Sequence, residues 1–126
     1  MAKFGFSGII SHGDTDIRIN LQMYLFKEDD SFIVYCPALD LSAYGDTEEL
    51  TKKAFEDVLS VNIEYMMNKG TIFDDLKNHG WIVKGKKQRK IKAPTFDELL
   101  KRSDALQDIA RNKDYTKYSQ NVCIPA

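Results

Sequence analysis

Cysteine and histidine are scarce in this sequence, which has two of each among its 126 residues. Cys36 and Cys123 stand far apart in apolar stretches and form no CxxC pair. We therefore expect reduced, buried thiols rather than a disulfide scaffold or a paired-thiol metal or redox site. His12 and His79 have no ligand partner at a useful spacing, so the sequence predicts no metal site and no cofactor.

Long apolar runs and a dominant charge are missing as well. No segment approaches the ~20 apolar residues that cross a bilayer, and residues 1–10 lack the pattern of a secretory signal. Lys and Arg number 18 against 19 acids, so no net field points to nucleic acid or membrane. A chain of this length with 43% apolar residues can bury its own core, and we expect one cytoplasmic domain.

The first half of the chain has the alternation of an antiparallel meander. Residues 1–14 show no clear period and are interpreted as a weakly ordered arm. Apolar residues alternate over 17–25, which indicates a strand with one buried face. Residues 31–37 predict a second, more central strand, and residues 41–44 a short third one.

After Gly45 the period changes, and residues 46–70 predict one long amphipathic helix. We expect Asp46 to cap it, with Glu49 in capping-box spacing, and Gly70 to end it. The expected buried residues are Leu50, Ala54, Val58, Val61 and Tyr65, widened by Phe55, Leu59, Ile63 and Met66.

Two shorter elements follow the long helix. Residues 72–78 predict a helix with Thr71 as its cap and Gly80 as its end, and residues 81–84 a strand beside the meander. The basic run after them is able to contact phosphates without reading bases, or to dock an acidic patch on a protein partner, but a solvated loop is the default interpretation. Its candidate nucleic-acid contacts are Lys86, Lys87, Arg89 and Lys90.

The last third predicts two short helices and a strand. Thr95 and Glu98 stand in capping-box spacing at the first helix, and Asp104 and Gln107 at the second. Residues 114–126 favour a strand that pairs with a sheet edge or with a second subunit. A helix-turn-helix is less compatible with this region because the turn lacks glycine.

The stretch between the second strand and the long helix contains Asp40, Asp46, Glu48 and Glu49. These acids suit a two-metal cluster that cleaves phosphodiesters. They also suit a turn and a helix start, where acids satisfy free N–H groups and complement the helix dipole. We prefer the structural interpretation, because three of the four acids fall within one helix start.

The same stretch resembles the HicB-like antitoxin family. That family has a strand ending near a Pro-x-Leu motif, a short strand, Gly-Asp/Glu-Thr/Ser, and a Glu-rich helix start. The similarity covers residues 17–67, and Leu50 departs from the alanine that the family often has. The matching residues are Tyr35, Pro37, Leu39, Gly45, Asp46, Thr47 and Glu49.

The resemblance implies a partial RNase H-like fold without nuclease carboxylates, and a protein that neutralises a small ribonuclease toxin of the HicA type. It directs partner contacts to Tyr35, Leu39 and Tyr44, provided that their side chains face outward. Many members of the family carry a C-terminal DNA-binding module, but residues 85–126 match neither a helix-turn-helix nor a ribbon-helix-helix, so DNA binding is only weakly indicated.

We therefore predict an α+β protein with a mostly antiparallel, three- to four-stranded sheet and one long helix on a face. Residues 15–84 form this core, and residues 85–126 a basic loop and C-terminal extension that packs on it or on a second subunit. The predicted function is a non-catalytic, antitoxin-like binding protein that forms a homodimer or larger homo-oligomer. The alternatives are a metal-dependent nuclease using Asp40, Asp46 and Glu49, and a dimeric module with another partner.

Overall fold

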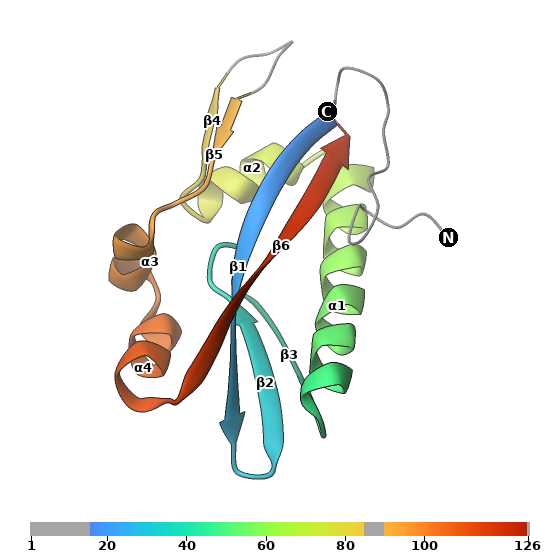
Figure 1. Cartoon of the computed structure of the whole chain (residues 1–126). Coiled ribbons are helices and arrows are strands. Elements are labelled where there is room, and N and C mark those ends of the chain that lie inside the picture. Colours follow the sequence, from blue (N-terminus) through green and yellow to red (C-terminus); the bar gives the residue numbers. More distant parts are fainter. Residues whose placement is uncertain (1–15, 85–89, 126) are drawn as a thin grey trace.

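Four antiparallel strands in the order β3-β2-β1-β6 form the centre of the computed structural model, which describes residues 16–84 and 90–125 (Figure 1). The chain lays down β1 (Asp16–Glu28), β2 (Ser31–Cys36) and β3 (Leu41–Gly45) as the predicted meander. The predicted C-terminal strand also forms. It is β6 (Tyr115–Pro125), and it pairs with β1 of the same chain from Asp16–Pro125 to Phe26–Tyr115.

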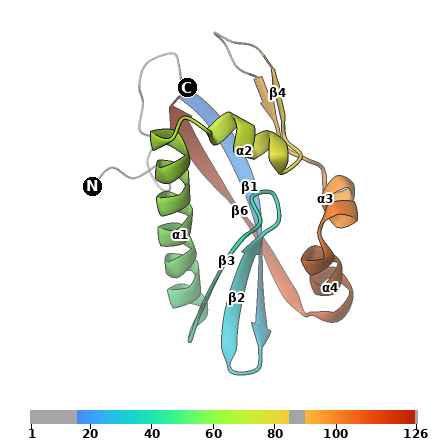
Figure 2. The same cartoon turned by 180° about the vertical axis from the view of Figure 1, so that it is seen from behind.

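One face of the sheet is covered by the long helix α1 (Glu48–Asn68), which confirms the α+β architecture. Alternate β1 residues point to this face, where they meet apolar residues of α1. The buried members of this cluster include Leu21, Met23, Val34, Phe55, Leu59 and Ile63. Helix α2 (Ile72–Asn78) follows, with the bounds that the sequence predicts, and crosses from the end of α1 toward the next strand (Figure 2).

Two short helices, α3 (Phe96–Arg102) and α4 (Asp104–Asn112), cover the opposite face of the sheet (Figure 1). Their Leu99, Leu106 and Ile109 pack against strand residues that alternate with the first set, namely Tyr24, Phe26 and Tyr35. The sheet is therefore buried on both faces in this region, whereas the sequence predicted one buried face.

The predicted strand at residues 81–84 lies elsewhere than expected. Residues Ile82–Lys84 form β4, which pairs with β5 (Lys90–Lys92) in a separate two-stranded sheet rather than beside the meander. A partner a few residues along the chain costs little closure entropy, which favours this local pairing. Trp81, just before β4, is buried, and its Nε1 donates to the carbonyl of Ala38 over 2.8 Å.

The predicted helix caps are shifted by one residue at two helices. Thr47, not Asp46, caps α1, and its hydroxyl accepts from the Leu50 N–H at 3.1 Å. Ser103, not Asp104, caps α4 and accepts from the Leu106 N–H at 3.0 Å. In both cases the cap has an extended backbone and the next residue is the first helical one.

The predicted buried stripe of α1 is wrong in part. Leu50, Val61 and Tyr65 are 54%, 66% and 57% exposed. The fully buried positions are Phe55, Leu59 and Ile63, with the polar Thr51 and Ser60 beside them. The predicted set and the observed buried set both have helical spacing. In the folded protein the observed set faces the sheet.

Gly45 explains why a polar residue faces the sheet at the start of α1. A Cβ at Gly45 would lie 2.9 Å from Thr51 Oγ1, so glycine lets the end of β3 approach the helix closely. The Thr51 hydroxyl is satisfied within its own helix, because it donates to the Thr47 carbonyl at 2.6 Å.

Two other predictions have a clear outcome, one at the start of α3 and one at Cys36. Thr95 and Glu98 form the expected capping box at α3. Cys36 is a buried free thiol, and burial raises its pKa to about 12. Residues 1–14, predicted as a weakly ordered arm, lie outside the described part of the chain. Among the described helices, none is both long enough and apolar enough to span a membrane.

Candidate functional site

The β2–β3 turn, residues 37–40, is the part of the molecule where separate elements converge. Its first three residues, Pro37, Ala38 and Leu39, are buried, and Asp40 follows as an exposed residue with φ of +53°. Aspartate tolerates this left-handed backbone better than most residues. The turn therefore sinks its apolar residues into the core and presents one carboxylate at the surface.

Tyr35 holds that carboxylate in place. Its hydroxyl donates to Asp40 Oδ1 over 2.8 Å and lies 3.0 Å from Ser103 Oγ. Burial raises the pKa of Tyr35 from 10.0 to about 12, so the phenol stays protonated and remains a donor at neutral pH. Because Ser103 also caps α4, this one phenol connects the β2–β3 turn to the second face of the sheet.

Two hollows open beside the turn and share Asp40 and His79 in their walls. The first, of about 300 Å³, has a mainly apolar wall that includes Leu41, Tyr65 and Leu76. The second, of about 290 Å³, has a polar wall from α3 and α4 that includes Arg102, Ser103 and Asp104. We call them the paired hollows.

The charge around the paired hollows is predominantly negative. Asp40, Asp75 and Asp104 contribute three carboxylates. Arg102, which also lines the second hollow, is tied to the end of α2, because its Nη2 donates to the Asn78 carbonyl at 2.7 Å. A surface of this kind attracts a cationic ligand or a basic protein.

The predicted partner contacts divide between core and surface. Tyr35 and Leu39 are only 7% and 6% exposed, so they do not meet the condition that their side chains face outward. Tyr44 is 77% exposed at the edge strand β3 and does meet it. The sequence analysis treated Asp40 only as a metal ligand or a turn residue. In the structure Asp40 is exposed at the end of the β2–β3 turn.

The acids proposed for the nuclease alternative are not gathered into one site. Within residues 16–84 and 90–125, no three His, Cys, Asp or Glu side chains lie together in a position to hold a metal ion. Asp40 lies at the paired hollows, whereas Asp46 and Glu49 are exposed at the start of α1.

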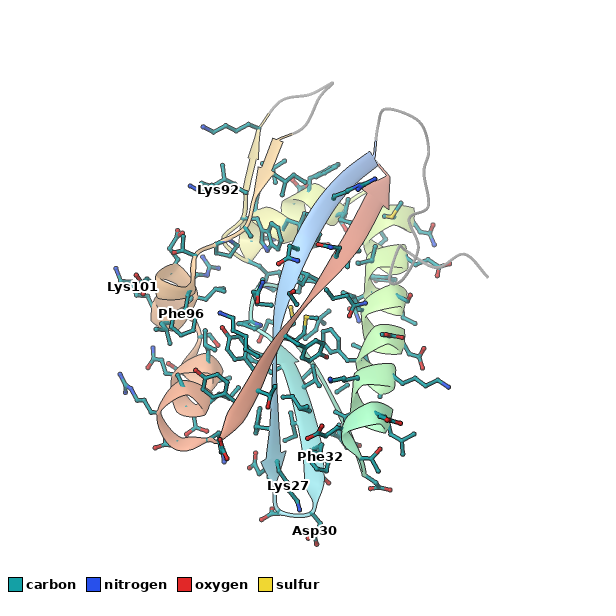
Figure 3. The ribbon with its side chains drawn as sticks, in the orientation of Figure 1. Lys27, Asp30, Phe32, Lys92, Phe96 and Lys101 are labelled. Carbon is teal, nitrogen blue, oxygen red and sulfur yellow. The ribbon has the colours of Figure 1, made fainter. Side chains whose placement is uncertain are left out.

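The candidate nucleic-acid contacts fall largely outside the described residues. Lys86, Lys87 and Arg89 belong to the undescribed segment, and Lys90 is described only as the first residue of β5. Two described cations, Lys92 on β5 and Lys101 on α3, lie on one side of the molecule (Figure 3).

Sequence reasoning missed most of the site. His79, Arg102, Ser103 and Asp104 come from segments that follow the β2–β3 turn by about 40 to 65 residues, and no spacing connects them with Asp40.

The comparisons with known proteins add no relative. No protein-family profile matches the chain, and neither the curated proteins nor the solved structures include a significant match.

Proposed function

We propose that this protein is a non-catalytic, antitoxin-like binding protein that neutralises a small HicA-type ribonuclease by direct contact. Two features support the proposal. The stretch that resembles the HicB-like family forms a meander that runs straight into a long helix, as an RNase H-like core would require. The turn within that stretch presents an ordered carboxylate beside two hollows.

The negative rim of the paired hollows is the observation that carries the proposal. A ribonuclease holds the phosphates of RNA with cationic side chains, and an acidic surface competes for the same cations. Asp40 is suited to this because its position is fixed twice, by a left-handed backbone and by the Tyr35 hydroxyl. A group held before binding loses little conformational entropy when the partner arrives.

The exposed Tyr44 extends this surface along the β3 edge. Tyrosine is enriched in protein interfaces because it combines a large apolar ring with a polar tip. An interface that uses the paired hollows and Tyr44 would put the charged contacts at the turn and the apolar contact on the neighbouring strand.

The test begins with the neighbouring genes: a short reading frame for a small basic protein would supply the partner, which is then purified and assayed as a ribonuclease. We expect a complex that inhibits cleavage of a labelled RNA and weakens as salt is raised. Asp40→Asn keeps the left-handed backbone and the acceptor for Tyr35 but removes the charge. It should weaken binding about tenfold, as loss of one charge contact at an interface does.

Asp30→Asn is the matched control, because it removes the same charge. Asp30 is exposed at the tip of the β1–β2 hairpin (Figure 3) and lines neither of the paired hollows nor the hollow beside Tyr44. Its substitution should leave inhibition unchanged. The proposal fails if no complex forms at micromolar concentrations, or if both substitutions weaken inhibition equally.

A further inference from the structure

A second surface, away from the β2–β3 turn, lies along one side of α1. Leu50, Val61 and Tyr65 are more than half exposed, and Ala54 and Val58 between them are half-buried. The spacing of four, four, three and four residues sets all five on one side of the helix. We call these five residues the α1 stripe. A stripe of apolar residues at such intervals is the pattern by which two helices pack together.

The α1 stripe is symmetric about its own centre. Leu50 and Tyr65 are equally far in sequence from the midpoint between Asp57 and Val58, and so are Ala54 and Val61. An antiparallel copy of the same helix therefore sets Leu50 against Tyr65 and Ala54 against Val61, with Val58 near the two-fold axis. Each contact then pairs a larger side chain with a smaller one, which lets the two helices interdigitate.

The charges beside the α1 stripe favour the same arrangement. Lys53 and Glu64 lie on one flank of the stripe and are exposed. In an antiparallel pair, Lys53 of each copy lies beside Glu64 of the other, giving two ion pairs. The C-cap residue Lys69 also comes beside Glu48 and Glu49 at the start of the other helix. In a parallel pair related by a two-fold axis, this flank of one helix lies beside the opposite flank of the other, so the Lys53–Glu64 pairs do not form.

We infer that the α1 stripe is the interface between two copies of this chain, packed as antiparallel helices about a two-fold axis near Val58. The second copy is the occupant that fits, because the flanks carry both signs of charge in an order that complements itself. Asp57 opposes the association, since it lies near the axis and meets Asp57 of the second copy. Tyr65, at the end of the α1 stripe, also lines the apolar hollow, whereas the other four residues of the stripe line neither hollow, and the inference does not depend on the ribonuclease.

The oligomeric state of the full chain tests the interface. Sedimentation equilibrium should show a concentration-dependent dimer. Val61→Glu puts a charge opposite Ala54 of the second copy and should weaken dimerisation at least about tenfold. The control is Ile82→Glu, because Ile82 is an exposed apolar residue, 46% exposed, on β4 rather than α1. Circular dichroism of both variants should match the parent protein.

Charge reversal tests the direction of packing. Lys53→Glu and Glu64→Lys should each weaken the dimer, and the double variant should restore it, because the pairs re-form with their signs exchanged. Asp57→Asn should strengthen the dimer by removing the repulsion at the axis. The inference is overturned if the parent protein stays monomeric, if Val61→Glu leaves the dimer intact, or if the double charge reversal is as weak as the single ones.

Discussion

The two faces of the sheet are covered by different means. One face packs mainly against a helix of 21 residues that follows the meander directly in the chain, and its buried cluster also includes apolar residues of α2 and Trp81. The other face packs against helices of 7 and 9 residues from the last third of the chain, and its strand residues include two tyrosines. The first face depends on apolar packing, whereas the second combines packing with the Tyr35–Ser103 connection.

The largest expected effect comes from truncating one core residue on each face. Phe55 and Leu106 are both fully buried. Phe55→Ala should lower the free energy of unfolding by about 4 kcal/mol, and Leu106→Ala by about 3 kcal/mol. Urea denaturation measures both, and amide exchange locates them. Leu106→Ala should release amides of α3 and α4 while α1 stays protected. Equal loss of protection across both faces would contradict the comparison.

A smaller effect is expected from removing one cap on each face. Ser103→Ala removes the cap of α4 and the partner of Tyr35, and should cost about 2 kcal/mol. Thr47→Ala removes only the cap of α1 and should cost about 1 kcal/mol. Asp46→Ala is the control and should change stability by less than ~0.5 kcal/mol. A larger loss for Asp46→Ala than for Thr47→Ala would reverse the assignment of the cap.

A third effect is absent at neutral pH and is expected only in alkali, where stability depends on pH. Burial raises the pKa of Tyr24, Tyr35 and Tyr118 from 10.0 to about 12. In the unfolded chain these phenols lose their protons near pH 10, whereas in the folded protein they keep them until about pH 12. Stability is therefore unaffected below pH 10 and falls as the pH rises from 10 to 12, because the unfolded state then binds fewer protons.

Replacing these tyrosines with phenylalanine shows how much each face of the sheet contributes to the loss of stability at alkaline pH. Tyr24 and Tyr35 belong to the α3–α4 face, and Tyr118 packs against the α1 face. Replacing the first two should flatten the alkaline fall more than replacing Tyr118 alone. Denaturation midpoints measured across this pH range, with tyrosinate absorbance followed in parallel, give the result. If the denaturation midpoint depends on pH in the same way in all variants, groups other than these three tyrosines cause the loss of stability.

The α1 face was largely predictable from the sequence, and the α3–α4 face was not. Alternation over 17–25 identified the residues that meet α1, because their neighbours in sequence are mostly polar. Tyr24 and Phe26 occupy the other side of the same strand. Without knowledge that two helices return to cover them, they fit an exposed side equally well.

The element boundaries show how local chemistry sets the limit of prediction. Helix α2 was located correctly because Thr71 and Gly80 bracket it. The caps of α1 and α4 were missed by one residue because Asp46–Thr47 and Ser103–Asp104 each offer two adjacent candidates. Only the backbone conformation of the folded chain distinguishes them. The paired hollows were not predictable at all, since their walls come from segments that meet only in three dimensions.

Strand β6 has a consequence for how the protein is made. It is the last described element, yet it lies alongside β1, the first one, over eleven paired positions. While a ribosome is still producing the intervening segments, that edge of β1 has no partner and presents free N–H and C=O groups to other chains. Newly synthesised copies are therefore most prone to aggregation just before residues 115–125 emerge, and a chaperone that shields strand edges should raise the yield of native protein.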